Sequence, residues 1–200
     1  MNRQQRLRPA CAGIAAIEFA LILPLLLLLA LPIVDLARAI QANMILINIS
    51  REGANIASRS AQLDSVSSQN VMNALAATTP PLDMSKQGMV YITKVMGHLQ
   101  AGVVRNVILE QYRWTGNPGY APASTVWTCA SWANDGSCSG IPANPDNAGT
   151  ANTMTGLLAD GDVVYAVEAF YNFNTMYAGL NLGFGKLPAI GPNLYSKTIF

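Results

Sequence analysis

The sequence predicts an α+β protein: an N-terminal transmembrane helix continuing into a long amphipathic stem, then a small antiparallel sheet head with a long disulfide-closed loop. Three observations support this prediction. An almost unbroken apolar run covers residues 14–34, and β-rich runs separated by turn signals follow in the second half of the chain. Charged residues make up 12% of the chain, against about 25% in soluble domains, which points to a membrane.

The apolar run is long enough to cross a bilayer once. A helix rises about 1.5 Å per residue, so residues 14–34 span about 30 Å, the thickness of the hydrocarbon core. The segment before the run carries three arginines and no acid. The positive-inside tendency therefore places the N-terminus in the cytoplasm and everything after Val34 outside.

Three simpler interpretations of this segment are a secretory signal peptide, a lipoprotein and an uncleaved anchor. A signal peptide cut near Ala39 is disfavoured, because signal h-regions have about 7 to 15 apolar residues and this run is longer. A lipoprotein would need its cysteine after the run, whereas Cys11 precedes it. An uncleaved anchor accounts for everything except Glu18.

Glu18 places a carboxylate near the start of the span, where a charged side chain costs up to about 3 kcal/mol. If the chain is cut after Gly13, the new amine of Ile14 lies one helical turn before Glu18 and can pair with it. The amine of a neighbouring copy could serve equally, and Glu18 would then set the register of an assembly. On physical grounds alone, a Glu18 that reaches back to the lipid headgroups is an equal alternative.

These residues resemble a known family. Gly13, Ile14 and Glu18 ahead of a Leu-rich span are similar to the class IV prepilin signal, with Gly before the cut and Glu at the fifth mature position. The proline-bearing run at 21–29 and the Arg-Glu-Gly-Ala segment at 51–54 resemble the TadE-like pseudopilins of the tight-adherence (Flp) pilus. The resemblance implies cleavage by a prepilin peptidase at the bacterial inner membrane. It also implies a role as a minor pilin or assembly factor, with other pilins and the pilus assembly platform as partners.

The pattern divides the chain into four parts: a basic cytoplasmic leader at 1–13, the transmembrane helix at 14–34, the amphipathic stem at 35–62 and a periplasmic or extracellular α+β head at 63–200. The stem has a polar stripe and, on another side, an apolar row formed by Leu36, Ile40, Met44 and Ile47. This row packs either on partner stems or on the protein's own head, and both options stay open.

One short helix and four β-rich runs are predicted in the head. Asp64 is the N-cap candidate for the helix at 65–77. The β-rich runs lie at 89–95, 107–114, 163–173 and 194–200. The stretch 97–102, which contains His98, turns the chain between the first two runs. Both faces of the third run are largely apolar, which indicates a central strand, and the last run supplies an edge.

Residues 115–156 form a long loop rich in Gly, Pro, Asn, Ser and Ala. Loops of this length are usually functional or partly disordered. Cys129 and Cys138 are predicted to form a disulfide, which an exported segment permits. Trp127 and Trp132 flank Cys129, and packing against the disulfide is the favoured account over an adhesive or partner-binding surface.

The composition argues against several classes of function. The formal net charge is +1, with no basic block beyond the N-terminus, so nucleic acid is not an expected partner. His98 is the only histidine and no paired C-x-x-C spacing occurs, so neither a metal nor a cofactor is expected. No nucleophile and base are arranged for catalysis. We predict a structural protein rather than an enzyme, with a membrane-anchored adhesin or binding module as the alternative.

Overall fold

The structure is a computed structural model that describes residues 11–60, 63–176 and 193–200. Its elements, in order, are α1 (Cys11–Arg59), α2 (Ser65–Ala77), α3 (Met84–Gln87), β1 (Gly88–Gln100), β2 (Val103–Arg113), the 3-10 helix η1 (Pro145–Asn147), β3 (Val163–Asn172) and β4 (Asn193–Ile199). The chain divides into two compact units. The first unit comprises residues 1–40 and 174–190, and the second comprises residues 41–173 and 191–200.

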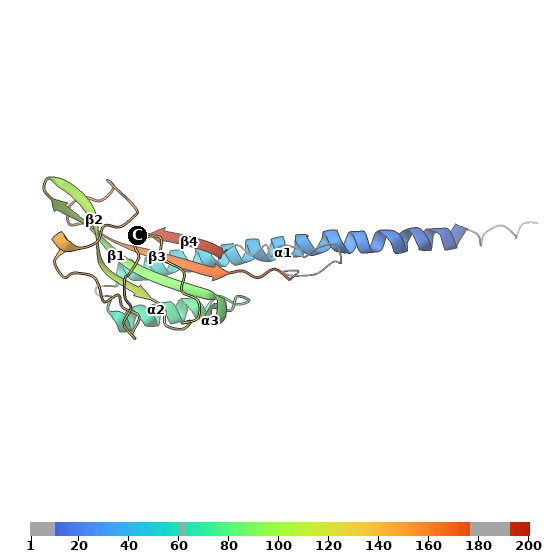
Figure 1. Cartoon of the computed structure of the whole chain (residues 1–200), viewed down its shortest axis with the longest axis horizontal. Helices are drawn as coiled ribbons and strands as arrows, with labels where there is room; N and C mark the ends of the chain where they lie inside the picture. Colours follow the sequence, from blue (N-terminus) through green and yellow to red (C-terminus); the bar gives the residue numbers. More distant parts are fainter. Residues whose placement is uncertain (1–10, 61–62, 177–192) are drawn as a thin grey trace, which may run out of the picture. The chain divides into compact units, whose positions relative to one another are not determined.

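The second unit is built on one antiparallel sheet with the strand order β2-β1-β3-β4 (Figure 1). β1 and β2 form a hairpin whose two turn residues, Ala101 and Gly102, have positive φ angles of 50° and 82°. Turns of this hand match the twist of the flanking strands. β3 pairs with both β1 and β4. The α+β class, the central position of the third strand and the edge position of the last strand are thus confirmed.

The β1–β2 hairpin is longer than the sequence predicts. Gly97 and His98 do not turn the chain but remain in the ladder, where His98 pairs with Arg105. Gly97 serves another purpose, because its N–H donates to Asp162 and its carbonyl accepts from Gly161. A side chain at this position would collide with the adjoining turn, so the glycine permits a close approach rather than a reversal.

Two helices pack on one face of the sheet (Figure 1). The carboxylate of Asp64 caps α2 by accepting from the Ser67 N–H at 2.7 Å, and the Ser67 hydroxyl accepts from the Asp64 N–H in return. α2 buries Met72 and Leu75. The part of α1 that belongs to this unit buries seven residues, most of them small: Ala42, Leu46, Ile49, Ser50, Gly53, Ala54 and Ala57.

Gly53 shows how closely α1 lies against its neighbours. A Cβ atom at Gly53 would lie 2.8 Å from Leu75 Cδ1 and 3.0 Å from Val167 Cγ1. Glycine weakens an isolated helix, but here it lets the backbone of α1 approach α2 and β3 together. The packing of the second unit therefore requires a residue without a side chain at this position.

The long loop covers the opposite face of the sheet. Val167 faces α1, so its strand neighbours Ala166 and Glu168 face the other way. On that side Ala166 belongs to a core cluster that joins strand residues to loop residues: Val95, Ile108, Val126, Ala151, Leu158 and Ala166. The segment 115–156, which the sequence marks as functional or partly disordered, is therefore a third layer of the head.

Candidate functional site

The helical part of the first unit exposes a large apolar surface. None of the most apolar 18-residue window of α1 is buried, and side chains such as Leu21 are as much as 74% exposed. Pro24 and Pro32 lie inside the helix, which continues through both. By length and composition the helix can cross a membrane. An apolar surface of this extent requires cover by lipid or by other helices.

The predicted cleavage and registration residues lie at the start of this helix. Gly13 has no atom within 4 Å of the place where a Cβ would stand. Ile14 is 61% exposed, and Glu18 is exposed one helical turn later on the same side. Within the described ranges, no hydrogen bond or ion pair engages the Glu18 carboxylate. The predicted leader lies largely outside these ranges, since residues 1–10 are not described.

The apolar row of the stem is largely exposed among the described residues. Leu36 and Ile40 are 61% and 54% exposed, Met44 is 61% exposed, and Ile47 is only half-buried. Within the second unit Met44 is therefore exposed and Ile47 packs in part, whereas Leu36 and Ile40 belong to the first unit, so both options for the row as a whole stay open. The face of α1 that packs is offset around the helix and rich in small residues, because those residues allow a closer approach to the sheet than a row of Leu, Ile and Met does.

Asp35 is a buried acid directly after the predicted span. It is 2% exposed, and its carboxylate accepts from Arg38 Nη1 at 2.9 Å and from the Met176 N–H at 2.8 Å. All three residues belong to the first unit. The contact with Met176 could not be found from the sequence, because nothing local relates residues 141 positions apart.

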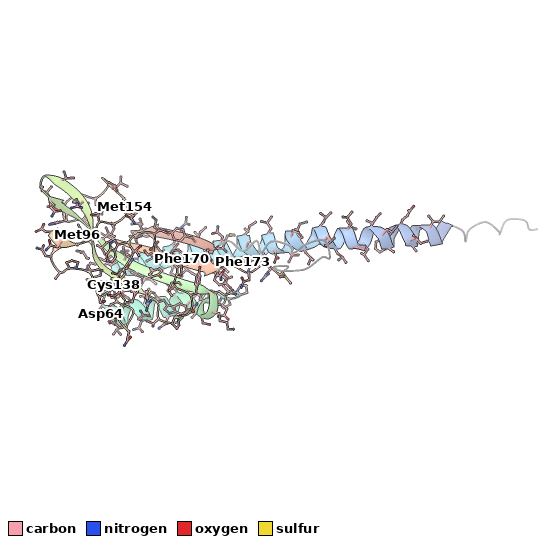
Figure 2. The ribbon with its side chains drawn as sticks, viewed as in Figure 1. Asp64, Met96, Cys138, Met154, Phe170 and Phe173 are labelled. Atoms are coloured by element: carbon pink, nitrogen blue, oxygen red, sulfur yellow. A yellow bond between two sulfur atoms is a disulfide. The ribbon has the colours of Figure 1, made fainter. Side chains whose placement is uncertain are left out.

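The predicted disulfide is present. Cys129 and Cys138 are bonded, with their Cα atoms 5.9 Å apart and a sequence separation of 9, and Figure 2 labels Cys138 in the head. A bridge between Trp132 and Cys138 pairs the two arms of this small loop. Closing a loop of this size stabilises a fold by about 2 to 3 kcal/mol, mainly by constraining the unfolded chain.

Both tryptophans of the loop are half-buried and pack within the head. Trp127 lies against the core cluster of the loop face. The ring of Trp132 lies 5.8 Å from that of Tyr91, and the guanidinium carbon of Arg113 lies 5.2 Å from the Trp132 ring centre. This arrangement favours aromatic packing over an adhesive surface. The ring contacts of Trp132 are with the strand residues Tyr91 and Arg113 rather than with the predicted partner, the disulfide.

A buried carboxylate that the sequence does not single out holds the loop to the sheet. Glu168 on β3 is fully buried. It accepts from the Thr125 N–H at 2.8 Å, the Thr125 hydroxyl at 2.7 Å, the Tyr195 hydroxyl at 3.0 Å and the Ser124 hydroxyl. Hydrogen bonds from neutral donors replace the water that the carboxylate loses on burial. The sequence feature that could have indicated this site is a single acid, Glu168, within an otherwise apolar strand.

Two tyrosine hydroxyls on this face act as donors. Burial raises the pKa of Tyr91 to about 12, and its hydroxyl donates to the Pro122 carbonyl. Burial, with the nearby charge of Glu168 adding to it, raises the pKa of Tyr195, whereas the Thr125 hydrogen bond lowers it. Both phenols therefore stay protonated at neutral pH and keep the loop attached to the sheet.

His98 also connects the loop to the sheet. Its Nε2 lies 2.7 Å from Asp146 Oδ1, and Gln100 Nε2 donates to the Asp146 carbonyl at 3.0 Å. His98 therefore lies within β1, opposite η1, and not in the turn predicted for residues 97–102. The sequence could not show this contact, since the partner is in a loop without periodicity.

The two acids before β3 act as turn residues. Asp160 Oδ1 accepts from the Leu99 N–H at 2.7 Å, and Asp162 Oδ2 accepts from the Ala159 N–H at 2.8 Å. Among the residues that the structure describes, no three His, Cys, Asp or Glu side chains gather to hold a metal ion. The chemistry of these side chains is therefore that of turn and loop anchors.

Comparison with known proteins bears on the N-terminal helix. No curated protein and no solved structure matches the chain. A family model described as TadE-like protein matches residues 13–55, which run from the predicted cleavage site past the close contact at Gly53. This match agrees with the resemblance predicted from the sequence: over residues 13–55 the chain is similar to TadE-like proteins.

Proposed function

We propose that the protein is a minor pseudopilin or assembly component of a tight-adherence pilus. It is made as a single-pass precursor in the bacterial inner membrane, with a cytoplasmic N-terminus and an exported head, and a prepilin peptidase cuts it after Gly13. The observation that carries the proposal is the TadE-like match over residues 13–55, on a helix whose apolar surface has no cover within the described chain.

Cleavage after Gly13 would create a charged amine with which the Glu18 carboxylate can pair. The new amine of Ile14 carries a positive charge one helical turn before the Glu18 carboxylate. Pairing with this amine, or with that of a neighbouring copy, lowers the cost of holding a carboxylate in the span. In an assembly the pair between copies would set the axial register of one helix against the next.

The stem supports assembly through its side chains. Leu36, Ile40 and Met44 form an exposed row at three- and four-residue steps, the spacing with which helices pack on other helices. Since these three side chains are exposed among the described residues, the helices of other pilins are the proposed partners of the row. The packed positions of Trp127 and Trp132 give no support to the adhesin alternative.

The N-terminal sequence and intact mass of the protein test the proposal. The protein is extracted from the membranes of cells that contain their own prepilin peptidase, and we expect a chain that starts at Ile14. The control is Gly13→Leu, which should retain the leader, because the prepilin signal requires glycine before the cut. A wild-type chain starting at Met1 would indicate an ordinary anchor, and one starting after Ala39 a secreted head. Either result contradicts the proposal.

A further inference from the structure

The two edge strands of the sheet, β2 and β4, differ in whether described residues pair with their outer sides. The loop runs along the outer edge of β2 and forms four backbone hydrogen bonds with it: Ile108 N–H to Gly149, Ala151 N–H to Asn106, Arg113 N–H to Gly136 and Cys138 N–H to Gln111. β4 forms the other edge. No described residue pairs with the outer side of β4.

The register of β4 shows which of its backbone N–H and C=O groups do not bond to β3. Tyr165 and Phe200 exchange both of their backbone hydrogen bonds, so even-numbered residues of β4 face β3 and odd-numbered residues face away. The outward-facing residues are Asn193, Tyr195, Lys197 and Ile199. Within the described parts of the chain their backbone N–H and C=O groups have no hydrogen-bond partner. An edge of this kind is a template for a further strand.

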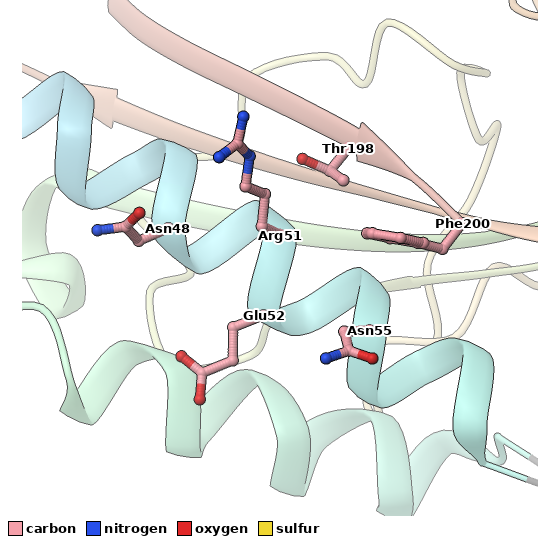
Figure 3. A pocket seen from close by; sticks show the side chains of 6 residues that line it. All are labelled: Asn48, Arg51, Glu52, Asn55, Thr198 and Phe200. Atoms are coloured by element: carbon pink, nitrogen blue, oxygen red, sulfur yellow. The ribbon is translucent and has the colours of Figure 1, made fainter.

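A groove lies beside this edge (Figure 3). It has a volume of about 620 Å³, and its lining comes from α1 and the end of β4: Asn48, Arg51, Glu52, Asn55, Thr198 and Phe200. Arg51 rises towards Thr198, whereas Glu52 points away towards α2. Arg51 forms no ion pair within the described residues, and the exposed Lys197 lies on β4 itself. The two cations lie on opposite faces of β4, because Lys197 Nζ donates to Thr153 Oγ1 at 3.3 Å on the loop face. The groove itself therefore holds Arg51 as its cation, and its acid Glu52 is directed away from β4.

We propose that the outer edge of β4 and the groove beside it bind an extended, acidic segment of another protein, which joins the sheet as a fifth strand. Its backbone pairs with the outward groups of Tyr195, Lys197 and Ile199. Side chains on one face of the added strand enter the groove, where a carboxylate meets Arg51. Main-chain pairing supplies affinity in strand addition, and alternate side chains supply specificity.

The partner is not a second copy of this chain. A symmetric pair of β4 strands would be antiparallel, because a parallel ladder needs an offset that a two-fold axis does not provide. Antiparallel pairing would bring the Lys197 side chains of the two copies close together on one face of the sheet, and like charges oppose such pairing. The β2 edge of another copy is not available either, since the loop covers it.

A synthetic peptide tests this inference on the full-length protein in lipid nanodiscs. The probe has the length of β4, alternates threonine with valine and carries one central glutamate; a second peptide has lysine in place of the glutamate. We measure binding by fluorescence anisotropy and backbone protection by amide hydrogen exchange. The glutamate peptide should bind about fivefold more tightly than the lysine peptide, and it should protect the amides of Tyr195, Lys197 and Ile199.

Two variants at one position separate backbone pairing from charge. Lys197→Pro removes an outward N–H without touching the bonds to β3, because proline is tolerated at the open side of an edge strand. This variant should bind the glutamate peptide about tenfold more weakly than the wild-type protein does. Lys197→Thr removes the charge but keeps the N–H, so the affinity for the glutamate peptide should fall only about threefold. Arg51→Glu should reverse the preference between the two peptides.

Three results would overturn the inference: equal binding of the two peptides, binding without protection of the three amides, or no binding by the wild-type protein. Dimerisation that Lys197→Pro abolishes would also overturn it, because the edge would then pair with a second copy. The start of the mature chain plays no part in these readouts, so failure here is distinguishable from failure of the proposed function.

Discussion

The two halves of α1 differ in the size of their side chains and in which of them are buried. From Ile14 to Ile40 the helix carries large apolar side chains, and these are exposed. From Gln41 to Arg59 the buried positions are mostly small, and Gly53 is required where the helix meets α2 and β3. One helix thus leaves its large side chains exposed among the described residues and packs small side chains within the second unit.

This difference shows that apolar character alone does not indicate where a helix packs. The Leu36–Met44 row is more apolar than the face formed by Ala42, Ser50 and Gly53, yet only the second face is buried. Small residues permit close backbone approach and dense packing. Large residues left exposed are available for lipid or for other helices.

The largest effect on the stability of the head is expected from Leu46→Ala. Leu46 is fully buried, so the substitution leaves a cavity and should lower the free energy of unfolding by about 2 to 5 kcal/mol. Met44→Ala, two residues earlier on the exposed row, should stay within about 0.5 kcal/mol of wild type. Chemical denaturation followed by tryptophan fluorescence measures both. Similar losses in the two variants would erase the distinction between the two faces of α1.

A smaller loss is expected from Gly53→Ala. The added methyl would meet Leu75 and Val167 at 2.8 and 3.0 Å, and overpacking of this kind costs about 1 to 3 kcal/mol. The better helix propensity of alanine offsets only part of this cost. Gly140→Ala is the control, because nothing lies within 4 Å of its Cβ position. A Gly53→Ala protein that is more stable than wild type in the same denaturation experiment would show that packing does not require the glycine.

Glu18→Ala should leave the stability of the head unchanged, since Glu18 lies outside the second unit. Its effect is expected in assembly. The mature chain should still start at Ile14, while the amount of assembled pilus falls by about tenfold or more, because removal of a charge pair inside a membrane leaves the new amine unpaired. N-terminal sequencing and quantitation of sheared filaments check the two halves of this prediction. Normal filament yield would leave Glu18 without a role in registration.

Much of the chain was predictable because its signals are local. The span follows from a continuous apolar run, α2 from the cap at Asp64, and β3 from residues that alternate along a strand. The disulfide follows from two cysteines that are close in the chain. The boundaries of β1 and β2 were less accurate, because Gly97 is a turn residue by type and a packing residue in fact.

The sequence by itself determined that the protein has an apolar helix able to cross a membrane, a family signature at its start and an α+β head, since each of these depends on neighbouring residues. Only the tertiary structure decided which face of α1 packs in the second unit, that the segment 115–156 forms a third layer, and that the loop covers β2 while no described residue pairs with the outer side of β4. These features depend on contacts between residues far apart in the chain, such as Glu168 with Thr125 and Gly53 with Val167. No local pattern encodes such pairs, because the free energy of each contact exists only once the chain has folded.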